Sequence, residues 1–307
     1  MDTVLITGGT GLVGKALVDL LLKKGYAVIV LTRNAADQAS QPNLSYAVWN
    51  VKKQEIDIAA VTKADYIIHL AGAGVVDKKW TPAYREEIQR SRTDSSRLLI
   101  ETLKDNPHKV QAIVSASATG WYGEDKLKGH AFKEEEQSAK DFLGETCRLW
   151  EESISAAETL GIRVVKLRTG IVLSKHGGAL AEFIKPVKFG LAGILGTGKQ
   201  IVSWIDVDDL CRMYLSAITN EKMAGSYNAV APAPVTNKEL TLKIAETIKG
   251  KFFIPMHVPE FVLKIMMGER AVEVLKSCTV SADKIKESGF TFVAPTIDAS
   301  LPRQLKN

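Results

Sequence analysis

The sequence predicts an α/β fold, with a doubly wound parallel sheet and a smaller C-terminal α/β lobe. Two observations predict it. Short runs rich in β-branched residues alternate with longer segments of helical periodicity through the first half of the chain, which is typical of βαβ units. A glycine-rich turn joins the first strand to the first helix. The 307 residues, 46% of them apolar, can bury one large domain or two closely joined ones.

The elements of the first half follow in order along the chain. The predicted strands are Thr3–Thr7, Ala27–Leu31, Leu44–Trp49, Tyr66–Leu70, Ala112–Ser115 and Val164–Leu167. The predicted helices between them are Leu12–Lys24, Pro82–Leu103 and Lys140–Leu160. Right-handed crossovers then place helices on both faces of the sheet. The second half is less regular, with two later helical patterns at Asn237–Lys249 and Pro259–Lys276.

Composition excludes several classes of protein. The net charge of +5 is modest and basic residues are interleaved with acidic ones, which indicates a solvated surface rather than a nucleic-acid partner. Cys147, Cys211 and Cys278 are far apart and lack CxxC spacing, so neither a zinc site nor a disulfide framework is expected. No signal peptide and no apolar run of roughly 18–20 residues is present, so we expect a cytoplasmic protein without a membrane partner or metal.

The turn after the first predicted strand has the spacing of a phosphate-binding loop. Its glycines follow the pattern Gly8-x-x-Gly11-x-x-Gly14 and open a helix. Such glycines permit a tight turn, a close approach of phosphate to the backbone and close packing of the helix on the strand. Free N–H groups at the helix start then bind a pyrophosphate. The residues expected to hold a dinucleotide here are Gly8, Gly9, Thr10, Gly11, Leu12, Val13 and Gly14.

The same stretch also contains GxxxxGK, the pattern of a mononucleotide P-loop, at Gly9–Lys15. That motif needs Ser or Thr at the next position to hold Mg²⁺, and this chain has Ala16. A P-loop NTPase is therefore disfavoured, and Lys15 is expected to face solvent.

The end of the second predicted strand indicates which dinucleotide is bound. An NAD site places a carboxylate here for the ribose 2′-hydroxyl, whereas this chain has Thr32 and Arg33 and no acid from Val30 to Ala36. A guanidinium can bind a 2′-phosphate through charge-assisted hydrogen bonds. We therefore expect NADP(H); the alternative is an ordinary surface arginine.

Five segments together resemble the extended short-chain dehydrogenases/reductases. They are Thr7–Gly14, His69–Gly72, Ser115–Gly123, Leu167–Leu173 and Trp204–Leu210. More narrowly, the chain resembles the atypical group of epimerase family proteins, also called cell-division-inhibitor-like. That resemblance rests on Lys79–Thr81, Ser91-Arg92, Ser203–Ile205, Met267–Ala271 and Ser288–Phe292.

The resemblance implies a Rossmann domain at residues 1–170, with later segments at about 200–215 crossing back, and a substrate lobe with a family-specific region at 171–307. It implies that Leu70, Ala71 and Gly72 pass beside the cofactor, and that Thr169 and Ile171 lie near its nicotinamide end. Asp208 and Asp209 resemble the superfamily's acidic pair that opens a late helix, expected to cap that helix and dock the lobes.

The catalytic YxxxK pair of the superfamily is missing. On the helix before the sixth predicted strand, Leu143 and Cys147 stand where Tyr and Lys are expected, and neither can transfer a proton in their place. A Tyr122-x-x-x-Lys126 match exists, but it falls in a glycine-bearing loop where helical i,i+4 geometry is not expected.

Ser117 and Tyr122 are the alternative candidates for catalysis. Ser117 would hydrogen-bond a substrate oxygen, and Tyr122 would donate to the same oxygen or carry a proton. The competing interpretations are a satisfied loop hydroxyl for Ser117 and a packing residue for Tyr122. Lys79, Arg85 and Arg92 are either a cationic rim for an anionic substrate or ordinary solvated charges.

The sequence thus supports two functional hypotheses. The first is an NADP(H)-dependent oxidoreductase or epimerase-like enzyme of non-standard mechanism, acting on a small-molecule substrate such as a nucleotide sugar or carbonyl compound. The second is a catalytically silent NADP(H)-binding sensor or regulatory protein. The sequence leaves the substrate and the choice between monomer and homodimer open.

Overall fold

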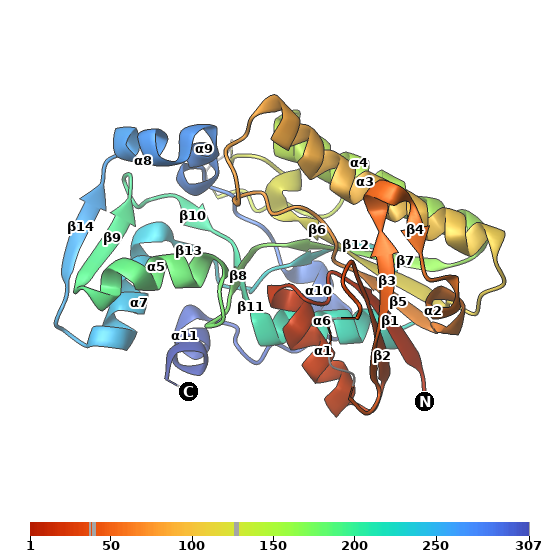
Figure 1. Ribbon diagram of the computed structural model, residues 1–307. Helices are drawn as coiled ribbons and strands as arrows, with labels where there is room; N and C mark the ends of the chain where they lie inside the picture. Colours follow the sequence, from red (N-terminus) through yellow and green to blue (C-terminus); the bar gives the residue numbers. More distant parts are fainter. Residues whose placement is uncertain (37, 39–40, 126–128, 307) are drawn as a thin grey trace.

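A computed structural model describes residues 1–36, 38, 41–125 and 129–306. Within these ranges the main sheet has eight strands (Figure 1). Their order across the sheet is β12 (Gly225–Ala229), β7 (Arg163–Thr169), β6 (Ala112–Ala118), β5 (Tyr66–His69), β1 (Thr3–Thr7), β2 (Ala27–Thr32), β3 (Leu44–Asn50) and β4 (Glu55–Ile56). All neighbours pair in parallel except β3 and β4, which confirms the predicted doubly wound α/β class.

Helices cover both faces of this sheet (Figure 1). The face at the top of the view carries α3 (Pro82–Asp105) and α4 (Phe142–Ser155), and α2 (Ile58–Lys63) lies beside them near the sheet edge. The opposite face carries α1 (Leu12–Lys23) and α6 (Val207–Thr219). Consecutive residues of each strand point to opposite faces, so Val4 and Ile6 pack under α1 and α6 while Leu5 packs under α3.

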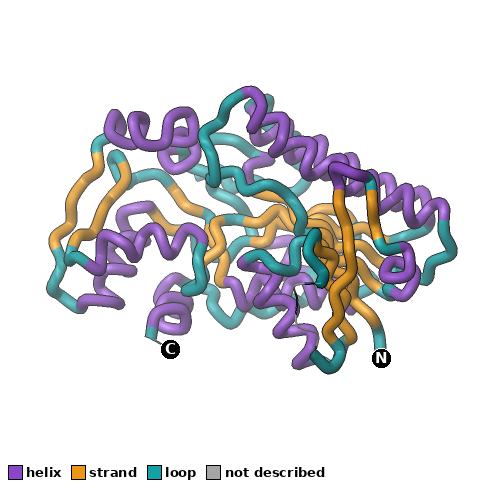
Figure 2. Tube along the Cα trace, viewed as in Figure 1, coloured by secondary structure: helices purple, strands orange, loops and turns teal. Residues whose placement is uncertain are grey.

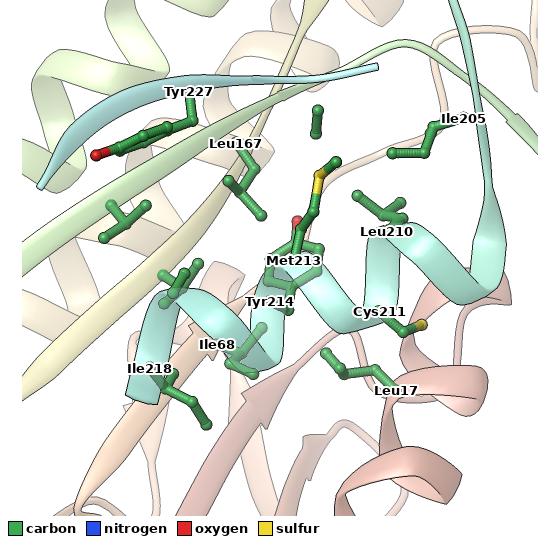
Figure 3. Packing of buried hydrophobic residues seen from close by; sticks show 14 of the residues in the cluster. Leu17, Ile68, Leu167, Ile205, Leu210, Cys211, Met213, Tyr214, Ile218 and Tyr227 are labelled. Atoms are coloured by element: carbon green, nitrogen blue, oxygen red, sulfur yellow. The ribbon is translucent and has the colours of Figure 1, made fainter. Parts of the chain in front are cut away.

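The core beneath α6 joins the two halves of the chain. Figure 3 shows Met213 and Tyr214 of α6 lying close to Ile68 of β5 and Leu167 of β7. Tyr214 and Met213 are almost fully buried. Because α6 and β12 come from residues after 200, the sheet is completed by chain that returns from the second lobe.

The second lobe is built from three two-stranded sheets and short helices among the described residues (Figure 2). The strand pairs are β8 (Ile171–Leu173) with β11 (Trp204–Asp206), β9 (Leu191–Leu195) with β14 (Ile254–Val258), and β10 (Ile201–Val202) with β13 (Val235–Thr236). The short helix α10 (Asp283–Glu287) packs on the main sheet, where its Ile285 joins the core beneath α6. The helices of the second lobe are α5 (Gly178–Lys188), α7 (Asn237–Lys249), α8 (Glu260–Met267), α9 (Ala271–Leu275) and α11 (Ile297–Leu305). Its core contains Trp204, whose indole N–H donates to the Ala233 carbonyl.

The predicted strands of the first half are all present, and most are longer by one or more residues at their carboxyl ends. The predicted helix Pro259–Lys276 was wrong as a single element. Gly268, at φ 62°, ends α8, and a 3₁₀ turn at Gly268–Arg270 separates it from α9. A left-handed backbone cannot continue a helix, so one periodic pattern becomes two short helices.

No helix in the described ranges is both long enough and apolar enough to cross a membrane.

Candidate cofactor-binding and active site

The loop between β1 and α1 has no room for side chains at three of its glycines, Gly8, Gly9 and Gly14. Gly8 adopts φ 71°, and a Cβ there would lie 3.0 Å from the carbonyl carbon of Leu70. A Cβ on Gly9 would lie 2.8 Å from the Val30 side chain, and one on Gly14 would lie 2.3 Å from the Gly8 carbonyl oxygen. The spacing of the glycines therefore reflects contact of the loop with β2, with α1 and with the segment after β5.

The start of α1 is open to a ligand. Gly11 is the N-cap residue and provides no side-chain cap, and no acidic residue occupies the first turn. Thr10 and Gly11 are exposed, and Lys15 is exposed as predicted. The first-turn N–H groups and the positive end of the helix dipole are thus available to a phosphate.

Thr7 links this loop to the segment that follows β5. Its Oγ1 accepts hydrogen bonds from the backbone N–H of Leu70 and of Ala71, each 3.1 Å. The same hydroxyl lies 2.8 Å from Nδ1 of His69 and can donate its proton there. Burial lowers the pKa of His69 to about 3, so its imidazole is neutral and holds the two loops in register.

Arg33 lies one residue beyond the end of β2 and is exposed. No ion pair within the described part of the chain involves Arg33, so its guanidinium is not held by a carboxylate there. Thr32, the last residue of β2, accepts a hydrogen bond from the Asn34 N–H at 3.4 Å. This edge of the loop is therefore polar and cationic.

The segment from Gly72 to Trp80 is tied down by α3. The Ala73 N–H donates to Ser91 Oγ at 3.0 Å, and the Ala73 carbonyl accepts from Arg92 at 3.1 Å. The Tyr84 hydroxyl donates to the Gly74 carbonyl at 2.5 Å. The segment is thus held in place by hydrogen bonds to α3.

Ser117 and Tyr122 lie in a buried polar network. The Ser117 hydroxyl donates to Glu151 at 2.7 Å, and Glu151 accepts two hydrogen bonds from Arg168. The Tyr122 hydroxyl donates to Asn228 at 2.6 Å and accepts from Arg168 at 3.0 Å. Burial raises the pKa of Tyr122 above its usual value.

This network favours the packing interpretation for Tyr122 and the satisfied-hydroxyl interpretation for Ser117. Both side chains are nearly inaccessible, at 5% and 3% exposure. A catalytic role for either residue stays a prediction, one that requires its hydroxyl to leave the network. Lys126 of the Tyr122-x-x-x-Lys126 match lies outside the described residues.

The two positions that replace Tyr and Lys lie together on α4. A Cβ on Gly120 would be 3.3 Å from Leu143 Cβ and 3.8 Å from Cys147 Sγ. Burial raises the pKa of the Cys147 thiol to about 12, so it is neither a base nor a nucleophile near neutral pH. This surface of α4 therefore supplies no proton-transfer group.

Comparison with known proteins places the chain in a family. The model of the NAD dependent epimerase/dehydratase family matches residues 4–230, which is most of the chain. The chain belongs to this family. A second model, a domain of unknown function (DUF1731), matches residues 258–303, and the family expected from the sequence is thereby confirmed.

Similar proteins span nearly the full length. The epimerase family protein SSP1921 of Staphylococcus saprophyticus is 34% identical over 303 residues, covering 98% of both chains. The chloroplastic SDR39U1 homolog of Arabidopsis thaliana is 34% identical and covers 94% of this chain and 83% of its own. The solved structure of human epimerase family protein SDR39U1 with NADPH matches with a TM-score of 0.85 at 25% identity, covering 99% of both chains.

Thr169 and Ile171, the residues that the resemblance puts near the nicotinamide, lie on either side of Gly170. Ile171 begins β8 and is 42% exposed. Thr169 ends β7, and its hydroxyl donates to the Leu167 carbonyl at 3.1 Å. Between them, a Cβ on Gly170 would lie 2.5 Å from the Ser203 carbonyl oxygen, so the chain is pressed against the second lobe here.

The acidic segment that opens α6 docks the end of the chain. Asp206, not Asp208, caps the helix and also accepts from Ser300 and Gln304. Asp209 is buried and accepts the backbone N–H groups of Val293 and Ala294.

The sequence did not predict the contacts made by the 3₁₀ turn Gly268–Arg270, which follows α8. Glu269 forms an ion pair with Arg85 of α3, and Arg270 donates to the Val76 carbonyl. The guanidinium of Arg85 also lies over the rings of Trp80 and Phe142. The C-terminal lobe thus contacts α3 and the segment from Gly72 to Trp80. In the sequence, the Met267–Ala271 motif marks this turn but not its partners.

A cavity of about 580 Å³ lies next to the Arg85–Glu269 ion pair. Residues of α8, α9 and the segment 196–200 line it, together with Glu124 and Glu269. The lining residues include none from the glycine loop, so this cavity is separate from the expected cofactor site.

Proposed function

We propose that the protein binds NADP(H) and catalyses hydride transfer to or from a small carbonyl or hydroxyl compound. The observation that carries the proposal is the glycine loop, where the backbone of β1, α1 and the segment after β5 approach too closely for side chains at Gly8 and Gly14. A loop of this kind, followed by a helix whose first N–H groups have no side-chain cap, fits a pyrophosphate, and no other kind of ligand is needed to explain it. The bound nicotinamide supplies the hydride acceptor or donor.

Preference for NADP(H) over NAD(H) rests on Arg33. Its exposed guanidinium at the end of β2 can form a fork with a 2′-phosphate, and the human relative SDR39U1 was solved with NADPH. Calorimetric titration with NADPH and NADH tests this. Arg33→Ala should weaken NADPH binding by about 10-fold or more and leave NADH binding nearly unchanged.

The matched control is Arg97→Ala. Arg97 is an exposed arginine of α3 that pairs with Asp94, and its removal should change neither affinity. Equal weakening of NADPH and NADH by Arg33→Ala would refute the 2′-phosphate assignment.

The protein's own residues position the reactants in this proposal. The Thr7–His69 contact holds the two loops beside the cofactor, and the tied segment 72–80 forms one wall. Since Leu143 and Cys147 carry no proton-transfer group, the proton comes from water or from the substrate unless Tyr122 is released from Asn228. The substrate is a small molecule held between this wall and the second lobe.

The lack of a proton-transfer group at Leu143 and Cys147 of α4 favours a second candidate, an NADP(H) sensor that does not turn over. Stopped-flow measurement of NADPH absorbance at about 340 nm, with a panel of carbonyl compounds and nucleotide sugars, separates the two candidates. Oxidation of NADPH with any member supports the enzyme. Tight NADPH binding without oxidation in long incubations supports the sensor.

We also propose that the protein acts in the cytoplasm. Its free cysteines Cys147, Cys211 and Cys278 are compatible with a reducing compartment.

A further inference from the structure

A cation is buried directly below the segment that follows β5. Arg92 of α3 is only 8% exposed. Its Nη1 donates to the carbonyls of Ile88 at 2.8 Å and of Ala73 at 3.1 Å. A Cβ on Gly72 would lie 3.1 Å from the guanidinium carbon, so the charge touches the backbone of this segment. Of the two alternatives for Arg92, an ordinary solvated charge is therefore wrong.

This cation has no counter-ion in the described part of the chain. No carboxylate there lies within ion-pair distance of Arg92, and the ionisable groups with which it interacts are Cys147, Tyr84 and His69, which are neutral near pH 7. Burial lowers the pKa of the guanidinium, which nonetheless stays charged because an arginine is protonated at every physiological pH. Burying a charge without a counter-ion costs roughly several kcal/mol of folding free energy.

The contrast with Arg168 shows which part of Arg92 is unused. Arg168 is also buried, and it holds Glu151 through Nε at 2.8 Å and Nη2 at 3.0 Å, the edge with which a guanidinium grips a carboxylate. On Arg92 the same edge, Nε and Nη2, makes no hydrogen bond to a described residue. One arginine edge is filled by an internal carboxylate and the other is free.

A second donor without an acceptor lies beside it. The Arg92 guanidinium lies 4.8 Å from the centre of the Trp150 ring, and the Trp150 indole N–H is buried with no acceptor in the described residues. Nε and Nη2 of Arg92 have no hydrogen-bond partner in these residues, yet they are not among the completely buried polar atoms that lack one. This edge of the guanidinium therefore faces a space that admits a water-sized atom. Free N–H donors and an unneutralised charge together fit an anionic oxygen ligand.

We propose that Arg92 binds a carboxylate of the substrate through its Nε and Nη2 edge. This inference rests on the proposed function, because it places the carboxylate between segment 72–74 and α4, next to the residues expected to pass beside the cofactor. The planar fork of the guanidinium matches two carboxylate oxygens, as Glu151 on Arg168 demonstrates within the same molecule. Arg92 thereby makes the site specific for acids, such as 2-oxo or 2-hydroxy acids.

The test uses the full chain saturated with NADPH. Pyruvate, 2-oxobutanoate and phenylpyruvate are titrated by calorimetry, each against its methyl ester, into wild type, Arg92→Gln and the control Arg97→Gln. At least one acid should bind wild type and Arg97→Gln about 30-fold or more tightly than its ester, the lower end of what an unpaired buried charge costs. Arg92→Gln should lose that discrimination and keep its NADPH affinity.

Three results would overturn the proposal. They are equal binding of acid and ester to wild type, no binding of any acid to the NADPH-loaded wild type, and retained discrimination in Arg92→Gln. If Arg92→Gln does not fold, Arg92→Lys carries the test: it keeps the charge but loses the fork, so acids should bind about 10-fold more weakly than to wild type. Failure of NADPH itself to bind wild type would refute the proposed function instead, and is measured first.

Discussion

Gly14→Ala tests whether the glycine loop is built by close packing. A Cβ at this position would lie 2.3 Å from the Gly8 carbonyl oxygen, 2.6 Å from Gly9 Cα and 2.7 Å from the Gly9 carbonyl carbon. All three atoms are backbone, so no side chain can rotate away. The loop or the first turn of α1 must therefore move by roughly 1 Å to reach ordinary contact distance.

Two opposing terms set the size of the effect on stability. Overpacking costs about 1–3 kcal/mol, whereas replacing glycine by alanine inside a helix gains about 1 kcal/mol. We expect a net loss of about 1–2 kcal/mol in the free energy of unfolding. The same movement displaces the N–H groups that face the pyrophosphate, and losing one charge-assisted hydrogen bond should weaken NADPH binding by about 10-fold or more.

Urea unfolding and calorimetric titration with NADPH measure the two effects. The matched control is Gly193→Ala in β9, where a Cβ would meet only Val258 Cγ2 at an ordinary 3.6 Å. That variant should change neither quantity by much. Wild-type stability and wild-type NADPH affinity in Gly14→Ala would show that the loop is not constrained as described.

Three further outcomes are expected. Glu151→Gln should lower the free energy of unfolding, measured by urea unfolding, by about 3–5 kcal/mol, because it leaves Arg168 buried without a counter-ion. A loss below about 1 kcal/mol would contradict this. Tyr122→Phe should cost about 1–3 kcal/mol through the unpaired Asn228 acceptor while NADPH affinity persists, and unchanged stability would argue that the hydroxyl is free to react. Since burial lowers the pKa of His69 to about 3, the unfolded state binds its proton first as pH falls below about 6.5; stability should therefore decrease toward pH 4, by up to about 1.4 kcal/mol per pH unit. His69→Gln should flatten this slope, and an equal slope in wild type and variant would refute the assignment.

Local patterns predicted the nucleotide-binding half of the molecule. Strand β1, the glycine loop and the start of α1 follow one another within 12 residues from Thr3 to Gly14, so spacing alone specifies them. The missing YxxxK pair was equally visible, because helical periodicity fixes which residues share a face of α4. The family resemblance supplied the rest of this half and agreed with the comparisons.

Contacts between distant segments were not predictable in this way. Arg85 and Glu269 are separated by 184 positions, and Tyr122 and Asn228 by 106. Nothing in the local sequence of Ser117 or Tyr122 indicates that Glu151 and Arg168 lie close enough to engage their hydroxyl groups. A hydroxyl near a predicted site therefore has the same sequence pattern whether it acts in catalysis or is held by distant partners.

The sequence by itself determined the fold class, the phosphate-binding loop and the loss of the usual acid–base pair, because each depends on residues close together in the chain. Only the tertiary structure decided which charges are satisfied. Arg168 and Arg92 are both buried arginines, yet one is neutralised by Glu151 and the other has an open edge beneath Gly72. Burial and the position of a counter-ion are set by how strands and helices pack, and this decides whether a charge holds the fold together or is free to bind a ligand.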